Sequence, residues 1–237
     1  MAKTIIVDEI PLNYTIEKLG EGYSAECFLT GDGQVFKRFF TRIKYLRDLL
    51  YLSEYKSEVF KFPEAFVYQY KELEENLLGY LMQYATGTRF DLLELDTNFK
   101  ELTKAIFELE KEIHRLTLRG LIITDINSHN MFYDKEKGIQ VVDTDLYIPT
   151  LEDDFRNMYR RNLMSLSETI ISRIVGINEF KSKTMKDLVM NCGGYGKIRP
   201  SQMLEGLADE AISLTGENIE TLGEFKEKMI ILKKNVI

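Results

Sequence analysis

Three polar side chains, Asp125, Asn130 and Asp143, flank two short runs of residues that favour β-strands. The runs, 131–133 and 139–142, are separated by a polar turn that ends in glycine, so they are predicted to pair as an antiparallel hairpin. This pairing would place Asn130 and Asp143 opposite one another, or one place offset, at the open end of the hairpin. Neighbours across such a pair lie about 5 Å apart. An amide oxygen and a carboxylate are therefore expected to lie close together.

Oxygen atoms at that separation can bind a hard divalent cation. Mg²⁺ takes oxygen ligands in proteins and usually keeps waters and substrate phosphates in its remaining positions. Asp125 precedes Asn130 by five residues, so its carboxylate would lie beside the metal without binding it. A free carboxylate there can orient or accept the proton of an attacking hydroxyl. The three residues together indicate magnesium-dependent phosphoryl transfer, although each one alone is explained about equally well as a turn residue.

The composition is that of an ordinary folded protein. A chain of 237 residues with 44% hydrophobic residues can form one large domain or two small lobes around a real core. Its two cysteines, Cys27 and Cys192, make no disulfide framework and have no metal-ligand spacing around them, which favours the reducing cytoplasm. No signal peptide or membrane span is expected. A net charge of -7 argues mildly against a nucleic-acid-binding surface.

The N-terminal part of the chain is expected to form a small antiparallel sheet with one helix. Short apolar runs separated by glycines and charged turns are typical of consecutive antiparallel strands. Apolar side chains at helical spacing between Thr41 and Lys56 predict a helix packed on that sheet. The expected strands are 14–19, 25–29, 34–39, 65–70 and 77–84.

The remainder of the chain is expected to be mainly helical apart from the hairpin. A sustained three-four spacing of apolar residues from Phe99 to Leu116 predicts an amphipathic helix that Gly120 closes. The other expected features are a helix over 162–175, two or three helices after Gly176, an N-cap at Ser201 and a flexible turn at 193–196.

Two lobes are expected from this change of character along the chain. Residues 1–86 hold the predicted sheet and its helix, and residues 87–237 hold the predicted helices and the hairpin. The expected fold class is therefore α+β, with a strand-rich N-terminal lobe and a mainly helical C-terminal lobe.

A glycine pair and a lysine in the N-terminal lobe could hold a nucleotide. Gly20 and Gly22 lie between two predicted strands, where the lack of a Cβ lets backbone N–H groups approach phosphate oxygens. In isolation such a pair is equally typical of any tight hairpin. Lys37 lies within a β-prone run, where it is either a snorkelling edge residue or a group that reaches a triphosphate.

From about Tyr14 to Ile174 the chain resembles the protein kinase superfamily, whose motifs occur in the same order. The resemblance implies a two-lobed protein-kinase-like fold, with ATP bound in the cleft between the lobes and Mg²⁺ as cofactor. It also implies a role for each matching residue. Gly20, Gly22 and Ala25 resemble the glycine-rich loop, Lys37 the lysine on the α- and β-phosphates, Met82 the gatekeeper, Gln83 and Ala85 the adenine-binding hinge, Asp125 the catalytic base, and Asn130 and Asp143 the metal ligands.

The same resemblance implies an acid on the N-terminal helix that pairs with Lys37. Glu54 fits this role by its distance ahead of Pro63, whereas Asp48 fits the leucine spacing that follows such an acid in many kinases. Glu54 is slightly favoured. A salt bridge from either acid would hold the lysine toward the phosphates, and the other acid would be a solvated helix residue.

Several positions depart from the kinase pattern. Ile123 and Thr124 replace a His-Arg pair, so regulation by a phosphorylated activation loop is not expected. Asn127 replaces a lysine that stabilises transition-state charge, and Asp145 replaces the glycine of Asp-Phe-Gly. Asp145 could join the metal site or cap a turn. No Ala-Pro-Glu signature follows, which implies a reduced platform for peptide substrates. Aminoglycoside, choline, homoserine and lipopolysaccharide-core kinases share these departures in part.

The residues and the resemblance favour an ATP- and Mg²⁺-dependent phosphotransferase that transfers the γ-phosphate to a hydroxyl, with a protein serine or threonine as the expected acceptor. The alternatives are a small-molecule hydroxyl kinase, a nucleotide-binding pseudokinase and a nucleotidyl transferase. Retention of the predicted phosphate, base and metal residues argues against a pseudokinase, because a scaffold has no physical need for all of them. The sequence indicates neither the acceptor nor the oligomeric state.

Overall fold

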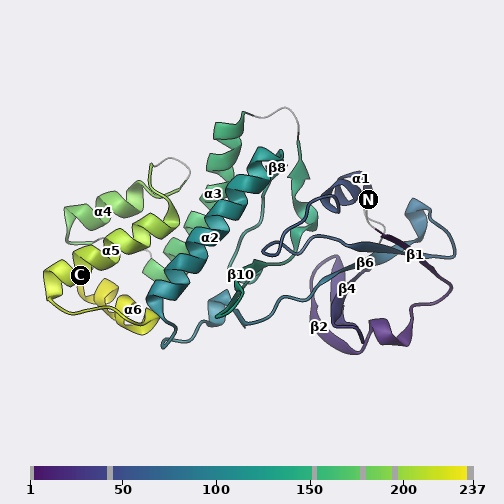
Figure 1. The fold of residues 1–237 in the computed structure, drawn as a ribbon, viewed down its shortest axis with the longest axis horizontal. Helices are drawn as coiled ribbons and strands as arrows, with labels where there is room; N and C mark the ends of the chain where they lie inside the picture. Colours follow the sequence, from purple (N-terminus) through teal and green to yellow (C-terminus); the bar gives the residue numbers. More distant parts are fainter. Residues whose placement is uncertain (1–2, 42–44, 151–153, 177–179, 194–196, 234–237) are drawn as a thin grey trace. The chain divides into compact units, whose positions relative to one another are not determined.

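The chain forms two compact units (Figure 1). Unit 1 comprises Met1–Ala85 together with Val142–Pro149, and unit 2 comprises Thr86–Val141 together with Thr150–Ile237. The predicted α+β class is confirmed, because a six-stranded sheet with one short helix is followed by a mainly helical part with small sheets. The computed structural model describes residues 3–41, 45–150, 154–176, 180–193 and 197–233.

Unit 1 is built on a six-stranded sheet with the order β1-β5-β6-β4-β3-β2. Its neighbours pair antiparallel except β1 and β5, which pair parallel. The expectation of an antiparallel sheet is therefore wrong at the β1 edge, where a run too short to be recognised as a strand pairs with β5. The elements are β1 (Lys3–Val7), β2 (Glu17–Glu21), β3 (Ala25–Leu29), β4 (Gln34–Phe39), α1 (Leu46–Leu52), β5 (Ala65–Gln69), β6 (Leu77–Gln83) and the short β11 (Ile148–Pro149).

The predicted element bounds in unit 1 hold in the middle of the sheet and fail at its ends. Strands β3 and β4 have the predicted bounds, whereas β2 begins later than expected because Leu12–Tyr14 forms a 3-10 turn after Pro11. Helix α1 is shorter than the predicted 41–56. It ends at Leu52, after which the Ser53 hydroxyl donates to the Leu50 carbonyl.

Strand β4 occupies the interior of the sheet, between β3 and β6. Because side chains alternate between the two faces of a strand, Phe36 enters the hydrophobic core with Val67 and Leu81, and Lys37 faces the opposite side. The backbones of β4 and β6 approach closely at Gly79, where an added Cβ would lie 2.0 Å from the Lys37 carbonyl oxygen. Only glycine fits at that position.

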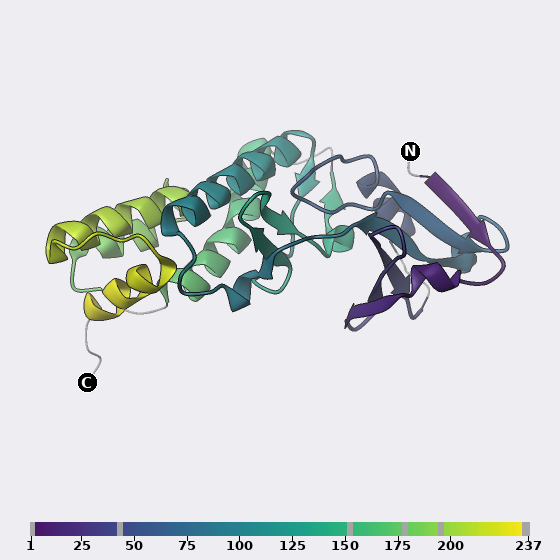
Figure 2. The same ribbon diagram turned by 60° about the horizontal axis from the view of Figure 1, so that its bottom comes forward.

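Unit 2 is built around the long helix α2, which packs against α3 and α5 (Figure 2). Helix α5 also contacts α4 and α6, and a small antiparallel sheet has the order β10-β9-β7. The elements are β7 (Thr88–Arg89), a 3-10 turn (Phe90–Leu92), α2 (Phe99–Leu118), β8 (Leu121–Ile122), β9 (Met131–Asp134), β10 (Gly138–Val141), α3 (Phe155–Ile170), α4 (Lys183–Met190), α5 (Pro200–Thr215) and α6 (Leu222–Ile231).

The two strongest sequence patterns in unit 2 are confirmed. Helix α2 begins after Asn98, whose side chain accepts a hydrogen bond from the Glu101 N–H, and Gly120 follows its last turn with a φ of 78°. The hairpin of β9 and β10 pairs Met131 with Val141. Both patterns are local, which is why the sequence predicts them well.

Two expectations about the other helices need correction. Helix α3 begins well before the predicted 162, because Asp154 caps it, and it continues through a π-helical turn to Val175.

Ser201 is not the N-cap of α5, since Arg199 takes that position. Instead the N–H and hydroxyl of Ser201 both donate at 2.7 Å to the buried carboxylate of Glu110 on α2. The predicted turn at 193–196 lies outside the described residues apart from Gly193.

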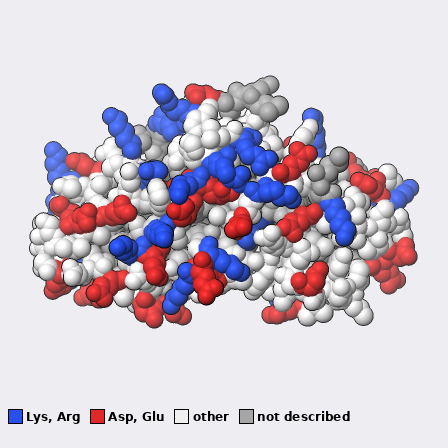
Figure 3. Space-filling view, viewed as in Figure 1, with Lys and Arg blue, Asp and Glu red and all other residues white. Residues whose placement is uncertain are grey.

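Two further expectations concern membrane spans and the charge of the surface. No helix in the described part of the chain is long and apolar enough to cross a membrane. Acidic and basic side chains are intermingled on the face shown in Figure 3. On α2, for example, Lys111 pairs with Glu108 and Arg115 with Glu112.

Buried Asn162 on α3 fixes the chain where it leaves α2. Its side-chain amide donates to the Thr117 hydroxyl at 2.8 Å and to the Leu121 carbonyl at 2.9 Å, and its oxygen accepts from the Ile123 N–H at 2.8 Å. Asn162 is fully buried, so these groups have no water to replace it.

We expect Asn162→Ala to lower the free energy of unfolding by about 3 kcal/mol, because it leaves several buried polar groups without partners. Urea denaturation followed by circular dichroism measures this loss. Asn157→Ala, at an exposed position of the same helix, is the matched control and should change stability by no more than about 0.5 kcal/mol. Equal denaturation midpoints for the two variants would contradict the role given to Asn162.

Candidate functional site

Lys37 lies in the middle of the unit 1 sheet and is almost completely buried. Its neighbours across the sheet are Cys27 on β3 and Tyr80 on β6. The ammonium group donates hydrogen bonds to the carboxylates of Asp143 and Asp145, with a distance of 2.6 Å to Asp145 Oδ1. The alternative of a snorkelling edge lysine is therefore excluded, because β4 is an interior strand and Lys37 is 7% exposed.

Burial and charge shift the pKa values of these three groups in different directions. Burial acts to lower the pKa of Lys37, but the carboxylates of Asp145 and Asp143 outweigh it and raise that pKa. Burial also acts to raise the pKa of Asp143, but Lys37 outweighs it and the pKa of Asp143 is lowered. The pKa of Asp145 is raised, chiefly by burial and further by Asp143, despite the attraction of Lys37. Asp143 is therefore the more firmly ionised acid.

The segment Val142–Pro149 carries both acids into unit 1 and holds Asp143 in a rare backbone conformation. Asp143 has φ 60° and ψ 46°, in the left-handed region that non-glycine residues seldom adopt. The Thr144 hydroxyl donates to the Lys61 carbonyl at 2.9 Å, and the Tyr147 ring packs edge-on against Phe60. Strained residues of this kind persist where the surroundings fix them, and they gather at functional sites.

Two tyrosines complete this group of residues, which we call the Lys37 cluster (Lys37, Asp143, Asp145, Tyr45 and Tyr80). The Tyr45 hydroxyl donates to Asp145 Oδ2 at 3.4 Å, and burial with the Asp145 charge raises the pKa of Tyr45 to about 12. The Tyr80 hydroxyl is fully buried and has no hydrogen-bond partner among the described residues. An unsatisfied buried hydroxyl beside an ion cluster indicates that a further polar group belongs there.

The acid expected from the N-terminal helix is not the partner of Lys37. Glu54 is exposed just beyond α1, and Asp48 lies half-buried in the first turn of that helix. The ion pairs of Lys37 are with Asp143 and Asp145. No periodic pattern in the sequence indicates this pairing, because Lys37 and Asp145 are 108 positions apart.

The predicted glycine-rich loop is the hairpin between β2 and β3. Gly22 closes it by donating its N–H to the Ala25 carbonyl at 2.8 Å, and the register shifts between Lys18 and Gly20. Neither glycine has a positive φ, and an added Cβ would meet nothing within 4 Å at Gly20 and only the Ala25 oxygen at 3.8 Å at Gly22. Packing within the fold therefore does not require glycine at either position.

The predicted hinge residues lie at the end of β6. Met82 is buried opposite Val35, and the Gln83 amide donates to Glu64 Oε1 at 2.8 Å. Ala85 is 6% exposed, yet its backbone N–H and C=O have no hydrogen-bond partner in the described part of the chain. Buried backbone groups are nearly always paired in folded proteins, so these two groups suit a ligand.

Asp125 and Asn130 belong to unit 2, where they lie together in the loop before β9. The Asn127 amide donates to Asp125 Oδ1 at 2.8 Å, and the Asn130 amide donates to Asp125 Oδ2 at 3.1 Å. Asn127 Oδ1 also accepts the N–H groups of His129 and Asn130. Both carboxylate oxygens of Asp125 are thus fixed in orientation, and Asn127 organises the whole loop. The sequence identified Asn127 only as a missing lysine.

The described residues contain no group of three or more His, Cys, Asp or Glu side chains arranged to hold a metal ion. The predicted metal ligands belong to different units, Asp143 to unit 1 and Asn130 to unit 2. The side-chain oxygen of Asn130 has no hydrogen-bond partner among the described residues. It is therefore available as a ligand.

No protein-family model and no curated protein matches this chain. The interpretation of the site therefore depends on the residues themselves.

We expect Lys37→Met to lower the free energy of unfolding by about 3 kcal/mol, because it leaves the acids of a buried ion cluster without their cation. The loss should shrink in acid, where Asp143 and Asp145 take up protons and no longer need a cation. In the wild type, Asp143 stabilises the fold above its ordinary pKa and loses this as pH falls through its lowered pKa. The pKa of Asp145 is raised. Its ionisation therefore lowers the free energy of unfolding as pH rises from its ordinary pKa through its raised pKa.

Urea denaturation at neutral and acidic pH measures both effects. Lys3→Met, at an exposed lysine of β1, is the matched control and should leave stability nearly unchanged. A loss for Lys37→Met that stays constant with pH would show that the cluster is not held together by charge.

We expect Asn127→Ala to loosen the Asp125 loop without unfolding unit 2. Amide hydrogen exchange at His129 should accelerate by about tenfold, because its N–H loses its acceptor. Exchange at Asn130 should accelerate less, because its N–H keeps the backbone carbonyl of residue 127 as a second acceptor. Exchange followed by nuclear magnetic resonance reports these two amides individually. Asn157→Ala serves as the control, and unchanged protection of both amides in Asn127→Ala would contradict this assignment.

Proposed function

We propose that the chain is an ATP- and Mg²⁺-dependent phosphotransferase with a two-lobed protein-kinase-like fold. The observation that carries the proposal is the Lys37 cluster, in which a buried interior lysine pairs with Asp143, a residue in a left-handed backbone conformation. A purely structural lysine does not need an acid in a strained conformation as its partner. A cytoplasmic location is part of the proposal, supported by the free thiols of Cys27 and Cys192.

In this proposal Lys37 and the hairpin of β2 and β3 bind the phosphates of ATP. The lysine is already desolvated and bound to two acids, so phosphate oxygens can replace a carboxylate at the same ammonium group. Packing does not require glycine at Gly20 or Gly22, and the lack of a Cβ at both positions would let phosphate oxygens approach the hairpin closely. The unpaired backbone groups of Ala85 suit the edge of an adenine ring.

Asp143 and Asn130 fit Mg²⁺ because both offer oxygen atoms. Mg²⁺ is usually held by one or two protein carboxylates together with substrate phosphates, rather than by an all-protein cage. The lack of a larger ligand group among the described residues agrees with this mode of binding. Bound Mg²⁺ would neutralise charge on the transferred phosphoryl group. Asp145 stays with Lys37 in this scheme, because its raised pKa makes it the weaker ligand.

Asp125 would orient the acceptor hydroxyl and take its proton. Its carboxylate is half-buried and held by the amides of Asn127 and Asn130, so it is positioned without being neutralised by a cation. A general base works best when its orientation is fixed in advance. Position 127 has no lysine, so the negative charge of the transition state would be stabilised mainly by Lys37 and the metal.

A protein serine or threonine remains the proposed acceptor, with a small-molecule hydroxyl as the second candidate. The second candidate is favoured by Asn127, which organises its own loop instead of reaching a substrate. A pseudokinase is the weaker alternative, because a scaffold needs neither the fixed Asp125 carboxylate nor the strained Asp143.

We expect Asp125→Asn to lower the rate of phosphoryl transfer at least a hundredfold while ATP still binds, because the variant loses the base and keeps the nucleotide contacts. The measurement is transfer of label from γ-labelled ATP to protein or to small metabolites in an extract of the source cells. Label in protein bands supports a protein serine or threonine as the acceptor, and label in metabolites supports a small-molecule hydroxyl.

Asp209→Asn, at an exposed acid of α5, is the matched control and should transfer label at the wild-type rate. Unchanged turnover in Asp125→Asn would mean that the proposed mechanism is wrong. Label from the α-phosphate in the product, rather than from the γ-phosphate, would indicate nucleotidyl transfer instead.

A further inference from the structure

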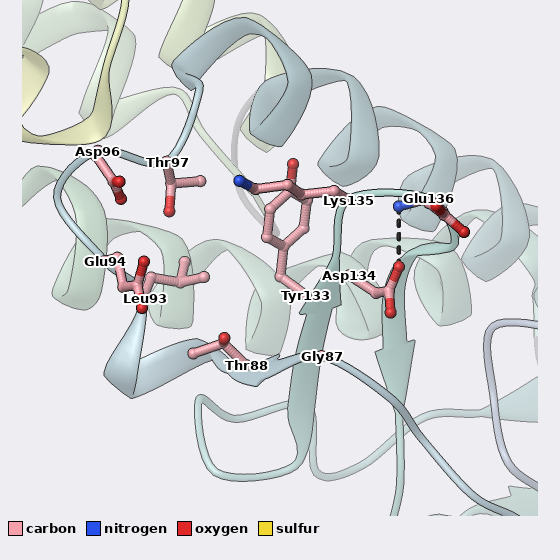
Figure 4. Close-up of a pocket in the computed structure, with 10 residues that line it drawn as sticks. All are labelled: Gly87, Thr88, Leu93, Glu94, Asp96, Thr97, Tyr133, Asp134, Lys135 and Glu136. Carbon is pink, nitrogen blue, oxygen red and sulfur yellow. Dashed lines mark hydrogen bonds between the residues drawn. The ribbon is translucent and has the colours of Figure 1, made fainter.

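Unit 2 contains a pocket of about 360 Å³ that the proposed phosphotransfer does not use (Figure 4). One wall is the loop between the 3-10 turn Phe90–Leu92 and α2, and the other is the hairpin of β9 and β10. Its volume lies at the lower end of the range for small-ligand sites.

Two side chains that line this pocket carry hydroxyl groups without hydrogen-bond partners among the described residues. Tyr133 and Thr97 are each 6% exposed, and neither hydroxyl has a hydrogen-bond partner among the described residues. Figure 4 shows the Tyr133 ring and the Thr97 side chain projecting into the space between the two walls. Burial, with the charges of Glu101 and Asp134, raises the pKa of Tyr133, so its hydroxyl stays neutral. Neither hydroxyl oxygen is among the fully buried side-chain atoms that lack a partner, so both are accessible to a ligand that enters the pocket.

The charged residues of the pocket are mainly acidic. Glu94 and Asp96 are exposed on one wall and make no ion pair, and Glu136 is exposed on the other. Lys135 is the one basic residue of the lining. Asp134 is already engaged, since it accepts from the Thr86 hydroxyl and from the N–H groups of the hairpin turn, and these hydrogen bonds lower its pKa. The uncommitted charge therefore favours a cation.

Both walls of the pocket are fixed before any ligand binds. The backbone of the first wall is tied to the start of α6, because Leu222 N–H donates to the Thr97 carbonyl at 2.8 Å and Gly223 N–H donates to the Leu95 carbonyl at 2.7 Å. Gly87 lies below Tyr133 with a φ of 95°, and an added Cβ would lie 2.2 Å from the Tyr133 carbonyl oxygen. A pocket held this way loses little entropy on binding.

From the two unpartnered hydroxyls, the free carboxylates and the rigid walls, we propose that this pocket binds an organic cation bearing N–H donors, an alkylammonium or a guanidinium group. The N–H groups donate to the Tyr133 and Thr97 hydroxyls, and the positive charge is balanced by Glu94 and Asp96. Such a group can come from a free polyamine or from a lysine or arginine side chain of a peptide. The inference goes beyond the proposed phosphotransfer and does not depend on it.

The test is calorimetric titration of the full chain with spermidine and, separately, with a capped tetrapeptide containing two arginines. We expect Glu94→Gln combined with Asp96→Asn to weaken binding by roughly tenfold, and Tyr133→Phe by roughly threefold. Binding should also weaken as salt is added. Tight binding of spermidine identifies a free amine as the ligand source, and tight binding of the tetrapeptide alone identifies a peptide.

The matched control is Asp209→Asn combined with Glu227→Gln, which removes two exposed acids from other helices of unit 2. It should bind both probes as the wild type does. Tetramethylammonium, which has one positive charge and no N–H donor, should bind at least roughly fivefold more weakly than methylammonium, which has the same charge and three N–H donors. The proposal is overturned if the control weakens binding as much as the pocket variant, if Tyr133→Phe has no effect, or if neither probe binds the wild type.

Discussion

A charged lysine in the interior of a sheet must be compensated, and unit 1 is organised around that requirement. Lys37 is desolvated on β4, between β3 and β6, and the acids that neutralise it come from the distant segment Val142–Pro149. That segment is held by the hydrogen bond from Thr144 to Lys61 and by aromatic packing of Tyr147. The cost of leaving a buried charge unpaired is several kcal/mol. The ion cluster therefore ties the distant segment Val142–Pro149, which includes the strained Asp143, to strand β4.

In unit 2, polar groups of the backbone are satisfied by the side-chain amides of two asparagines rather than by ion pairs. Asn162 satisfies the backbone groups where the chain leaves α2, and Asn127 satisfies those of the loop that carries Asp125. Buried Glu110 is held in the same way by Ser201. In each case one polar side chain meets several partners, so its removal disturbs more than one contact.

The sequence predicted the features that depend on neighbours along the chain. The bounds of β3 and β4, the amphipathic helix α2 and the hairpin of β9 and β10 follow from periodicity and turn residues. It failed where distant segments meet, as in the parallel pairing of β1 with β5 and the ion pair of Lys37 with Asp145. The expected acid Glu54 was chosen from a family pattern, and no local signal could correct it. The sequence correctly indicated that Asp125 and Asn130 lie close together, because five residues are few enough to lie in one loop.

The central claim is that the Lys37 cluster binds ATP together with Mg²⁺. Its most direct test is the affinity for ATP, measured by calorimetry on the wild type with Mg²⁺, on the wild type with the metal chelated, and on Asp143→Asn with Mg²⁺. The account predicts that chelation and the substitution each weaken ATP binding by at least roughly tenfold, because either change removes a charge-neutralising contact to the phosphates. Equal ATP affinity in all three measurements, or no ATP binding by the wild type, would contradict it.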